Sequence, residues 1–158
     1  MADAEALAQV HESAWRYAYA GVISGLTLER IVAGRGNGWW TRAIGRSNNI
    51  LVVDHDTTIA GYATLGPSRM RGLNYRGEIY EIYLKPEYHG IGFGHRLFQA
   101  ARNNLRSQGL SSHAVRVLTE NTPACRFYES QGGRKVAESQ DPIGPDRLPI
   151  SIYGWPGN

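Results

Sequence analysis

The stretch that decides the fold reads YEIYLKPEYHGIGFGHRLF and covers residues 80–98. It begins as an apolar, aromatic-rich strand that ends at Pro86, and it closes with an amphipathic helix. Between the two, Gly90, Gly92 and Gly94 stand at every second position. Glycines let the backbone take unusual dihedral angles and let a ligand approach closely, and the N–H groups at the start of a helix attract anions. The stretch therefore predicts a strand, a turn suited to phosphate, and a helix.

The glycine run alone leaves several ligands open. A P-loop is excluded, because Gly94 is followed by His95 and Arg96 where that motif has Lys and then Ser or Thr. The dinucleotide fingerprint matches weakly, since its third glycine is misplaced and no acidic residue ends a following strand about 20 residues later. An ordinary strand-to-helix turn without a ligand stays as the alternative.

The composition is that of an ordinary soluble globular protein. The 158 residues are 42% hydrophobic and 20% charged, and this length predicts one domain. The net charge of +3 is modest and no run of Lys or Arg stands out, which argues against a nucleic-acid surface. No apolar run reaches the length of a membrane span, and the N-terminus does not read as a signal peptide. We therefore expect a cytoplasmic protein that binds neither nucleic acid nor a membrane.

Hydrophobic periodicity predicts helices first, then a hairpin and a strand, then helices and strands in alternation. Thr27 and Thr122 are the expected N-caps of two helices. A Pro/Gly-rich loop is expected over residues 141–149, between the last two strands. This order predicts a mixed α/β sheet. The expected helices cover residues 4–19, 27–33, 39–44, 93–108 and 122–130, and the expected strands cover residues 50–53, 58–65, 78–84, 114–118, 134–138 and 149–155.

Two motifs resemble those of the GNAT superfamily of acetyl-CoA-dependent N-acetyltransferases. The first, HGIGFG at residues 89–94, resembles the family's acyl-CoA motif, Gln/Arg-x-x-Gly-x-Gly/Ala. The second, NTPACRFYESQGG at residues 121–133, matches the family pattern Asn-x-x-Ala-x-x-x-Tyr-x-x-x-Gly. The two motifs stand in the family's order and at its separation, which is far more specific than either motif alone.

The resemblance implies a single GNAT N-acetyltransferase domain over residues 1–158. Its fold is expected to be α/β (α+β), with a mixed, mostly antiparallel central sheet flanked by helices and with the family's first strand missing. The implied activity is direct transfer of an acetyl group from acetyl-CoA to a primary amine of a small molecule or peptide, through a ternary complex. Acetyl-CoA and an amine acceptor are the expected partners, and a homodimer is common in the family.

The resemblance also implies which residues bind acetyl-CoA. The pyrophosphate is expected on the N–H groups of the glycine turn, and the pantetheine arm on the exposed edge of the preceding strand. A free N–H near Tyr83 or Leu84 would polarise the acetyl carbonyl. His89 departs from the family's Gln or Arg, which alters one side-chain contact near the pyrophosphate. The residues expected at the cofactor are Ile82, Tyr83, Leu84, His89, Gly90, Ile91, Gly92, Phe93, Gly94, His95 and Asn121.

Acetyl transfer to an amine requires a neutral nucleophile, so a base must accept a proton, directly or through water. Glu81 is the first candidate, because it is the one acidic residue within the apolar stretch at residues 79–84. The alternative interpretation is a sheet-edge carboxylate paired with an arginine. Glu78 is the second candidate base, and an acceptor of low pKa would need no strong base.

The leaving group is the CoA thiolate, which a proton donor stabilises. The resemblance assigns this role to Tyr128, and the alternative is a core aromatic beside Phe127. No paired His and Asp spacing supports Cys125 as an acyl-enzyme nucleophile, and we interpret this single cysteine as structural. The sequence has no CxxC pair or Cys/His cluster, so no metal site is expected.

The acceptor side of the site carries a weaker signal. The loop at residues 66–72 contains two arginines that are candidates for binding a carboxylate or phosphate, although loop arginines are usually solvated. Two further classes of function stay open, a non-catalytic acyl-CoA-binding module and a nucleotide-phosphate-binding regulator. Four aromatic residues of the N-terminal half fit a hydrophobic core as well as an acceptor wall, namely Trp15, Tyr19, Trp39 and Trp40.

Overall fold

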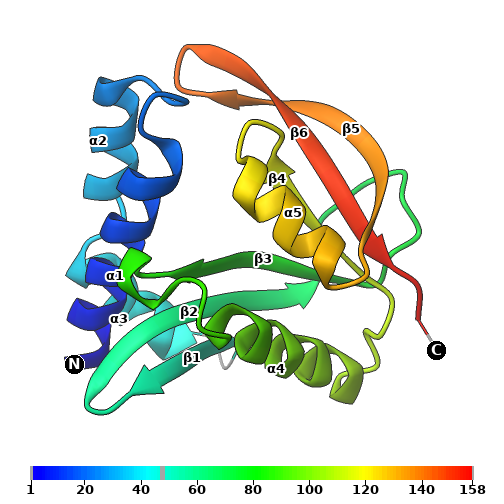
Figure 1. Ribbon diagram of the computed structural model, residues 1–158, viewed down its shortest axis with the longest axis horizontal. Helices are drawn as coiled ribbons and strands as arrows, with labels where there is room; N and C mark the ends of the chain where they lie inside the picture. Colours follow the sequence, from blue (N-terminus) through cyan, green and yellow to red (C-terminus); the bar gives the residue numbers. More distant parts are fainter. Residues whose placement is uncertain (1, 47–48, 158) are drawn as a thin grey trace. The chain divides into compact units, whose positions relative to one another are not determined.

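The structure is a computed structural model that describes residues 2–46 and 49–157. In the described chain, three helices come before the first strand (Figure 1). None of the helices in these residues is long and apolar enough to cross a membrane. The helices are α1 (Ala2–Tyr19), α2 (Gly25–Ala33), α3 (Asn37–Arg46), the 3-10 helix η1 (Pro86–Tyr88), α4 (Phe93–Ser107) and α5 (Thr122–Ser130). The strands are β1 (Ile50–His55), β2 (Thr58–Pro67), β3 (Gly77–Leu84), β4 (His113–Leu118), β5 (Arg134–Ile143) and β6 (Asp146–Trp155).

The strands are hydrogen-bonded in the order β1-β2-β3-β4-β6-β5. β1 pairs antiparallel with β2, as β4 and β5 both do with β6, whereas β3 and β4 run parallel. The mixed, mostly antiparallel sheet that we expected is therefore confirmed. The chain divides into two compact units, the first made of residues 1–64 with 81–100 and the second of residues 65–80 with 101–158.

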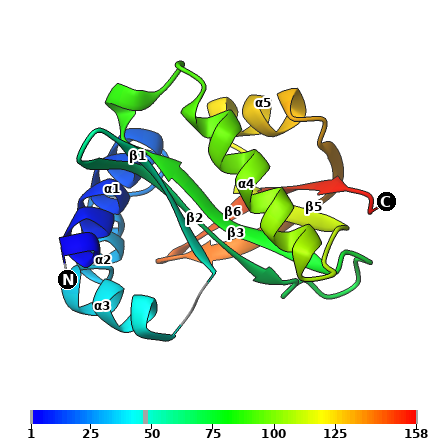
Figure 2. The same cartoon turned by 90° about the horizontal axis from the view of Figure 1, so that it is seen from below.

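The first unit contains the three N-terminal helices, the β1–β2 hairpin, the end of β3 and the start of α4 (Figures 1 and 2). On α1, Ala4, Leu7 and Val10 are each at most 1% exposed. Positions three residues apart lie on one face of a helix, and this face packs against Trp40 of α3 and Tyr62 of β2. The core of the first unit is thus formed by an apolar helix stripe and two large aromatic rings.

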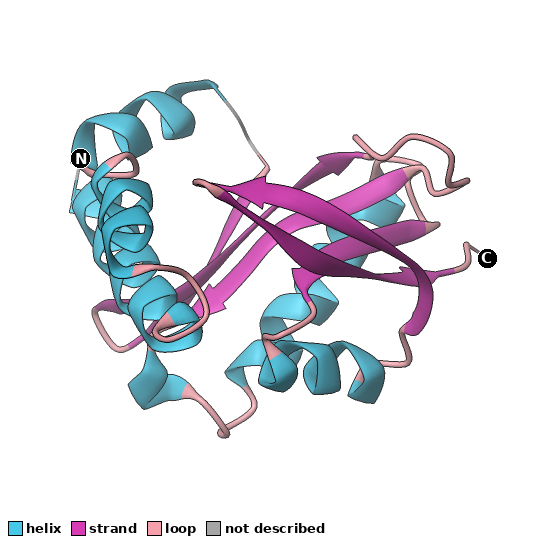
Figure 3. Cartoon of the chain, turned by 90° about the horizontal axis from the view of Figure 1, so that it is seen from above, coloured by secondary structure: helices cyan, strands magenta, loops and turns pink. Residues whose placement is uncertain are grey.

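The second unit is built on β4 and on the long β5–β6 hairpin, whose strands appear in magenta in Figure 3. Helix α5 packs against both strands of this hairpin. The register of β4 and β6 places His113 opposite Trp155, and their rings stack 5.1 Å apart. Gly154 is required beside them, because a Cβ there would lie 2.3 Å from the Tyr75 hydroxyl oxygen.

Two expected N-caps are wrong, and the true caps lie just upstream. Ser24, not Thr27, caps α2, because its Oγ accepts a hydrogen bond from the Thr27 N–H at 3.3 Å. Asn121, not Thr122, caps α5, with its Oδ1 accepting from the Ala124 N–H at 3.3 Å. A capping side chain must reach the N–H two or three residues ahead, so the residue before the first helical one is the cap.

The last two strands are longer than expected. β5 and β6 are separated only by Gly144 and Pro145, so most of the loop expected over residues 141–149 is strand. Pro142 lies on β5, at the end of the strand order, where a missing N–H is tolerated. Pro149 lies on β6 just before its pairing with β4 begins. Proline-rich composition therefore did not mark a loop, because both prolines avoid the central ladder.

Gly61 of β2 offers a test of how closely β3 passes within the first unit. A Cβ there would lie 2.6 Å from the Tyr83 carbonyl oxygen and 2.4 Å from Leu84 Cδ2. We expect Gly61→Ala to lower the free energy of unfolding by about 2 kcal/mol, because the backbone oxygen cannot give way without moving β3.

Gly45→Ala in α3 is the matched control, since a Cβ there would meet nothing within 4 Å. Alanine is the better helix former, so this change should raise the free energy of unfolding by about 0.5 kcal/mol. Urea denaturation measures both variants. Wild-type stability of Gly61→Ala would contradict the close approach of the two strands.

Candidate active site

The strand, glycine turn and helix predicted from residues 80–98 are all present. Gly90 and Gly92 have φ angles of +76° and +91°, in the left-handed region that side chains rarely adopt. Helix α4 begins at Phe93, and the Arg96 N–H donates to the Gly92 carbonyl at 3.1 Å. The N–H groups of a helix's first turn point beyond its N-terminus, where the helix dipole is positive. The turn therefore has the geometry of an anion-binding site.

His89 links this turn to its surroundings in the first unit. Its Nε2 lies 3.3 Å from the Leu84 carbonyl oxygen, at the end of β3. Its ring packs edge-on against Tyr17 of α1, with 5.3 Å between the centroids. The histidine thus makes structural contacts at the position where the resembled motif has Gln or Arg.

The edge of β3 loses its partner strand partway along. In the described chain the ladder between β3 and β4 ends at the pair Ile79↔Val115, although β3 continues to Leu84 and β4 to Leu118. Residues 82–84, which we expected to bind pantetheine, follow this last pair. A strand edge without a neighbour can pair with an extended ligand through its backbone groups.

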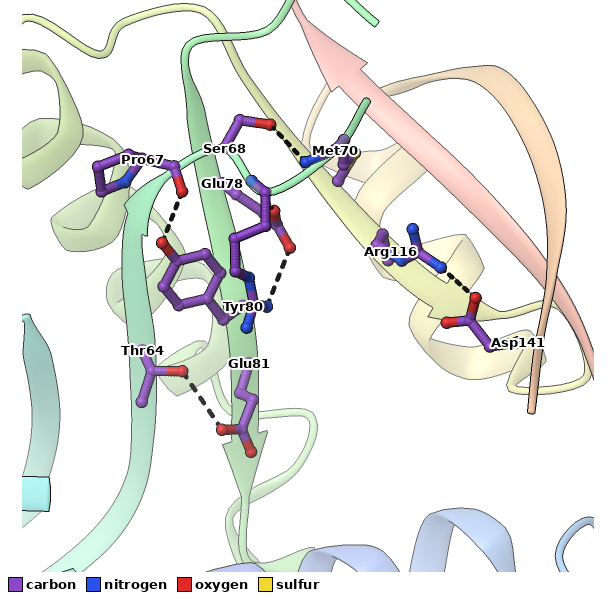
Figure 4. A network of polar contacts seen from close by, with 10 residues as sticks. Thr64, Pro67, Ser68, Met70, Glu78, Tyr80, Glu81, Arg116 and Asp141 are labelled. Atoms are coloured by element: carbon purple, nitrogen blue, oxygen red, sulfur yellow. Dashed lines mark hydrogen bonds and ion pairs between the residues drawn. The ribbon is translucent and has the colours of Figure 1, made fainter. Parts of the chain in front are cut away.

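Glu81 is held by three side chains of the first unit. Its Oε1 accepts a hydrogen bond from Arg35 Nη2 at 2.6 Å. The same oxygen accepts a longer one from the Thr64 hydroxyl at 3.4 Å, which Figure 4 shows. Its Oε2 accepts a hydrogen bond from the Tyr62 hydroxyl at 2.9 Å. The side chains of Glu81 and Arg35 are 17% and 21% exposed. The ion pair that we considered as an alternative is therefore present, and a catalytic role for Glu81 stays a prediction.

The phenols around Glu81 keep their protons at neutral pH. Burial raises the pKa of Tyr62 well above its usual range, and the charge of Glu81 adds to this. Burial likewise raises the pKa of Tyr83, whose hydroxyl lies 2.9 Å from that of Tyr19. Tyr62 is therefore the donor in its hydrogen bond to Glu81.

Glu78, the second candidate base, anchors a loop of the second unit. The residue is 1% exposed, and its two oxygens accept from the Arg69 N–H at 2.9 Å and from Arg69 Nη2 at 3.2 Å. The Arg69 guanidinium lies 3.7 Å from the ring centroid of Tyr80, whose hydroxyl donates to the Pro67 carbonyl at 2.6 Å (Figure 4). Arg69 is thus fixed to β3, and Glu78 is a weaker candidate for the base than Glu81.

Asn121 and Tyr128 are both buried in the second unit, at 8% and 6% exposure. The Asn121 carbonyl caps α5, which leaves its amide nitrogen as a donor group. The Tyr128 ring packs near those of Tyr153 and Trp155, with 6.2 Å between the centroids in each pair. Both residues therefore have structural contacts, and their roles at the cofactor stay predictions.

Cys125 is buried, with its Sγ 3.8 Å from the Leu118 and Thr119 carbonyl oxygens. Burial raises the pKa of its thiol, which disfavours the nucleophilic thiolate. These contacts agree with a structural cysteine. Across the described parts of the chain, no group of three His, Cys, Asp or Glu residues is arranged to hold a metal ion.

The aromatic residues of the N-terminal half pack into the interior of the first unit. Trp40 is fully buried and meets the Tyr62 ring edge-on at 4.8 Å, and Trp39 packs against the same cluster. Trp15 and Tyr19 lie 4.6 Å apart between ring centroids, and Tyr19 is 4% exposed. The structure thus favours the core interpretation of these rings.

Sequence reasoning missed the partners of Glu81. Tyr62 and Thr64 stand two positions apart on β2. Because side chains alternate between the two faces of a strand, the sequence could have indicated that these two face the same side of the sheet. Arg35 lies in a glycine-rich break, GRGNG at residues 34–38, and is separated from Glu81 by 46 positions. Nothing in the local sequence indicates that contact.

Comparison with known proteins places the chain among acetyltransferases. Residues 7–133 match the acetyltransferase (GNAT) family. The chain is 30% identical over 159 residues to the uncharacterized N-acetyltransferase YuaI of Bacillus subtilis, with 98% of this chain and 88% of that protein covered. It is 24% identical over 131 residues to the spermidine N(1)-acetyltransferase of Thermoplasma acidophilum, with 82% and 81% covered.

A solved structure shows the same fold. The PaiA N-acetyltransferase of Thermoplasma acidophilum, in complex with coenzyme A, has a TM-score of 0.74 at 22% identity, with 95% of this chain and 92% of that chain covered. Together these relatives define the class as an acyltransferase enzyme. The chain belongs to the GNAT family of N-acetyltransferases.

The capping assignment can be tested with two neighbouring substitutions. Asn121→Ala removes the hydrogen bond to the Ala124 N–H and should lower the free energy of unfolding by about 1 kcal/mol. Thr122→Ala, one residue later on the exposed first turn, should change it by less than about 0.5 kcal/mol. Urea denaturation without ligand measures both. A larger loss for Thr122→Ala would contradict Asn121 as the cap.

Proposed function

We propose that this protein, as one domain over residues 1–158, transfers the acetyl group of acetyl-CoA directly to a primary amine of a small molecule or peptide. The observation that carries the proposal is the glycine turn at the start of α4, with two left-handed glycines, following a strand whose edge lacks a partner after Ile79. Such a combination offers N–H groups for a pyrophosphate and a strand edge for an extended amide-containing arm.

The donor is held mainly by backbone groups in this proposal. The N–H groups from Gly90 to His95 receive the pyrophosphate, where the dipole of α4 favours negative charge. The backbone of residues 82–84 pairs with the pantetheine arm, and a backbone N–H near Leu84 polarises the acetyl carbonyl. The amide nitrogen of Asn121 adds a side-chain donor to the cofactor.

The reaction forms one N–C bond and breaks one C–S bond. The neutral amine attacks the acetyl carbon, and the proton that the nitrogen then carries passes to Glu81, directly or through water. The CoA thiolate leaves and takes a proton from the Tyr128 hydroxyl, which solvent later reprotonates. Glu81 is preferred over Glu78 as the base, because both Glu78 oxygens are occupied by Arg69 at 1% exposure.

The direct test is CoA release measured with a thiol reagent over a panel of primary amines that includes polyamines, amino acids and short peptides. The relative named for spermidine supports placing polyamines in the panel. Release above the rate of spontaneous hydrolysis with at least one amine is expected. CoA binding without release on any amine would instead favour a non-catalytic acyl-CoA-binding module. A heat-stability gain with ATP and not with CoA would favour the nucleotide-binding class.

Tyr128→Phe tests the proposed acid. We expect kcat to fall by about 100-fold, because the thiolate loses its proton donor, while the acetyl-CoA dissociation constant stays within about twofold. Tyr153→Phe is the matched control in the same unit, since it removes a phenol that donates to Glu129 at 2.8 Å. Steady-state kinetics and calorimetric titration give the two quantities. Unchanged turnover of Tyr128→Phe would remove this residue as the acid.

Glu81→Gln tests the proposed base. The amide cannot accept the proton, so kcat should fall by about 100-fold near neutral pH. The deficit should shrink as the pH rises, because more of the acceptor then binds already deprotonated. The pH dependence of kcat from pH 6 to 10 measures this trend. A parallel profile for variant and wild type would show that another group or water is the base.

A further inference from the structure

Arg35 lies beside Glu81 and has no role in the reaction proposed above. It lies between α2 and α3, and its guanidinium sits 3.8 Å from the ring centroid of Trp39 and 5.0 Å from that of Trp40. Its Nη2 reaches Glu81 Oε1 at 2.6 Å, and its own Nε is buried without a hydrogen-bond partner among the described residues. The two tryptophans and the carboxylate therefore fix the orientation of this guanidinium.

The contacts of Glu81 leave room on only one of its oxygens. Oε1 accepts from both Arg35 and Thr64, whereas among the described residues Oε2 accepts only from Tyr62. A carboxylate offers about four acceptor positions, two on each oxygen. The remaining position is thus on Oε2, the oxygen turned away from the guanidinium contact.

We propose that Arg35 is a positioning residue for Glu81: it holds Oε1 and leaves Oε2 as the atom that receives the acceptor's proton. This inference rests on the proposed function, in which Glu81 is the base. Arg35 is well suited to the task because a guanidinium stacks on aromatic rings and stays charged at every relevant pH. A lysine at this position would keep the charge and lose the planar stack.

The other titratable groups around Glu81 leave this role to Arg35. They are Tyr62 of β2, Tyr83 of β3, and Tyr19 and His11 of α1. The pKa of His11 is lowered to about 3, by burial first and by Arg35 second, so that its ring is neutral during turnover. Tyr62 and Tyr83 keep their protons. At neutral pH, Arg35 is therefore the cation of this group.

A carboxylate that is less well oriented accepts the proton less often, so kcat of Arg35→Gln should fall by about tenfold. KM for acetyl-CoA should stay within about twofold, because no contact among the described residues joins Arg35 to the glycine turn.

The experiment locates the Glu81 carboxylate independently of activity. Crystal structures of wild type, Arg35→Gln and Arg16→Gln show where Oε2 lies, and steady-state kinetics give kcat and KM for each protein. Arg16→Gln is the matched control, because it breaks an exposed arginine–carboxylate pair with Glu29 in the same unit.

The outcomes separate the inference from the proposed function. A displaced Glu81 carboxylate and a lower kcat in Arg35→Gln, with neither in Arg16→Gln, support the inference. A carboxylate that stays in place overturns it whatever the activity, and so does a displaced carboxylate with wild-type kcat. A displaced carboxylate in a protein that acetylates no amine supports the ion pair and overturns only the function.

Arg35→Lys covers the case in which Arg35→Gln does not fold. The retained charge should keep an ion pair with Glu81 and allow folding, whereas kcat should fall several-fold because the carboxylate is oriented less well. Wild-type kcat in folded Arg35→Lys would overturn the positioning role.

Discussion

A carboxylate placed among aromatic rings governs the arrangement of the first unit. Removing a charged group from water is costly unless an opposite charge and hydrogen-bond donors replace its hydration. Glu81 obtains both from Arg35, Tyr62 and Thr64. This requirement explains why a polar pair interrupts the apolar strand β2. It also explains why the break between α2 and α3 contains an arginine. Two tryptophans follow, and their rings lie close to the guanidinium and fix its orientation.

The donor and acceptor sides of the proposed reaction depend on different parts of the chain. The glycine turn acts through backbone N–H groups, which every sequence has once Gly90 and Gly92 allow the left-handed angles. A histidine can therefore stand at position 89, where it contacts Leu84 and Tyr17. The acceptor side acts through side chains. Relatives that share the turn can thus differ in their acceptors.

Much of the fold could be predicted from the sequence because its signals are local. Periodicity and glycine placement gave the strand, the turn and helix α4, and the motif at residues 121–133 gave the family. The errors came where a longer-range context decides. Thr27 and Thr122 were expected as caps because threonine is a common capping residue, whereas Ser24 and Asn121 fill that position. β5 and β6 were predicted too short, because the sequence does not distinguish a proline in an edge strand from a proline in a loop.

The candidate site was predictable only in part, for the same physical reason. Glu81 stood out as a lone carboxyl in an apolar strand, which is visible within a few residues. Its ion pair with Arg35 joins positions 46 apart and is created by the tertiary fold of the first unit. The spacing of these residues along the chain does not indicate such a contact. The choice between Glu78 and Glu81 likewise needed the exposure and partners of each carboxylate.

The early end of the β3–β4 ladder has a consequence for the lifetime of the protein. The backbone groups of β3 beyond Ile79 that face away from β2 have no β4 partner among the described residues, so an extended ligand can pair with them. A ligand that pairs with them binds the folded chain alone and adds RT ln(1 + [L]/Kd) to its stability, about 2.7 kcal/mol at a hundredfold excess over Kd. Resistance to proteolysis would then rise and fall with the supply of that ligand.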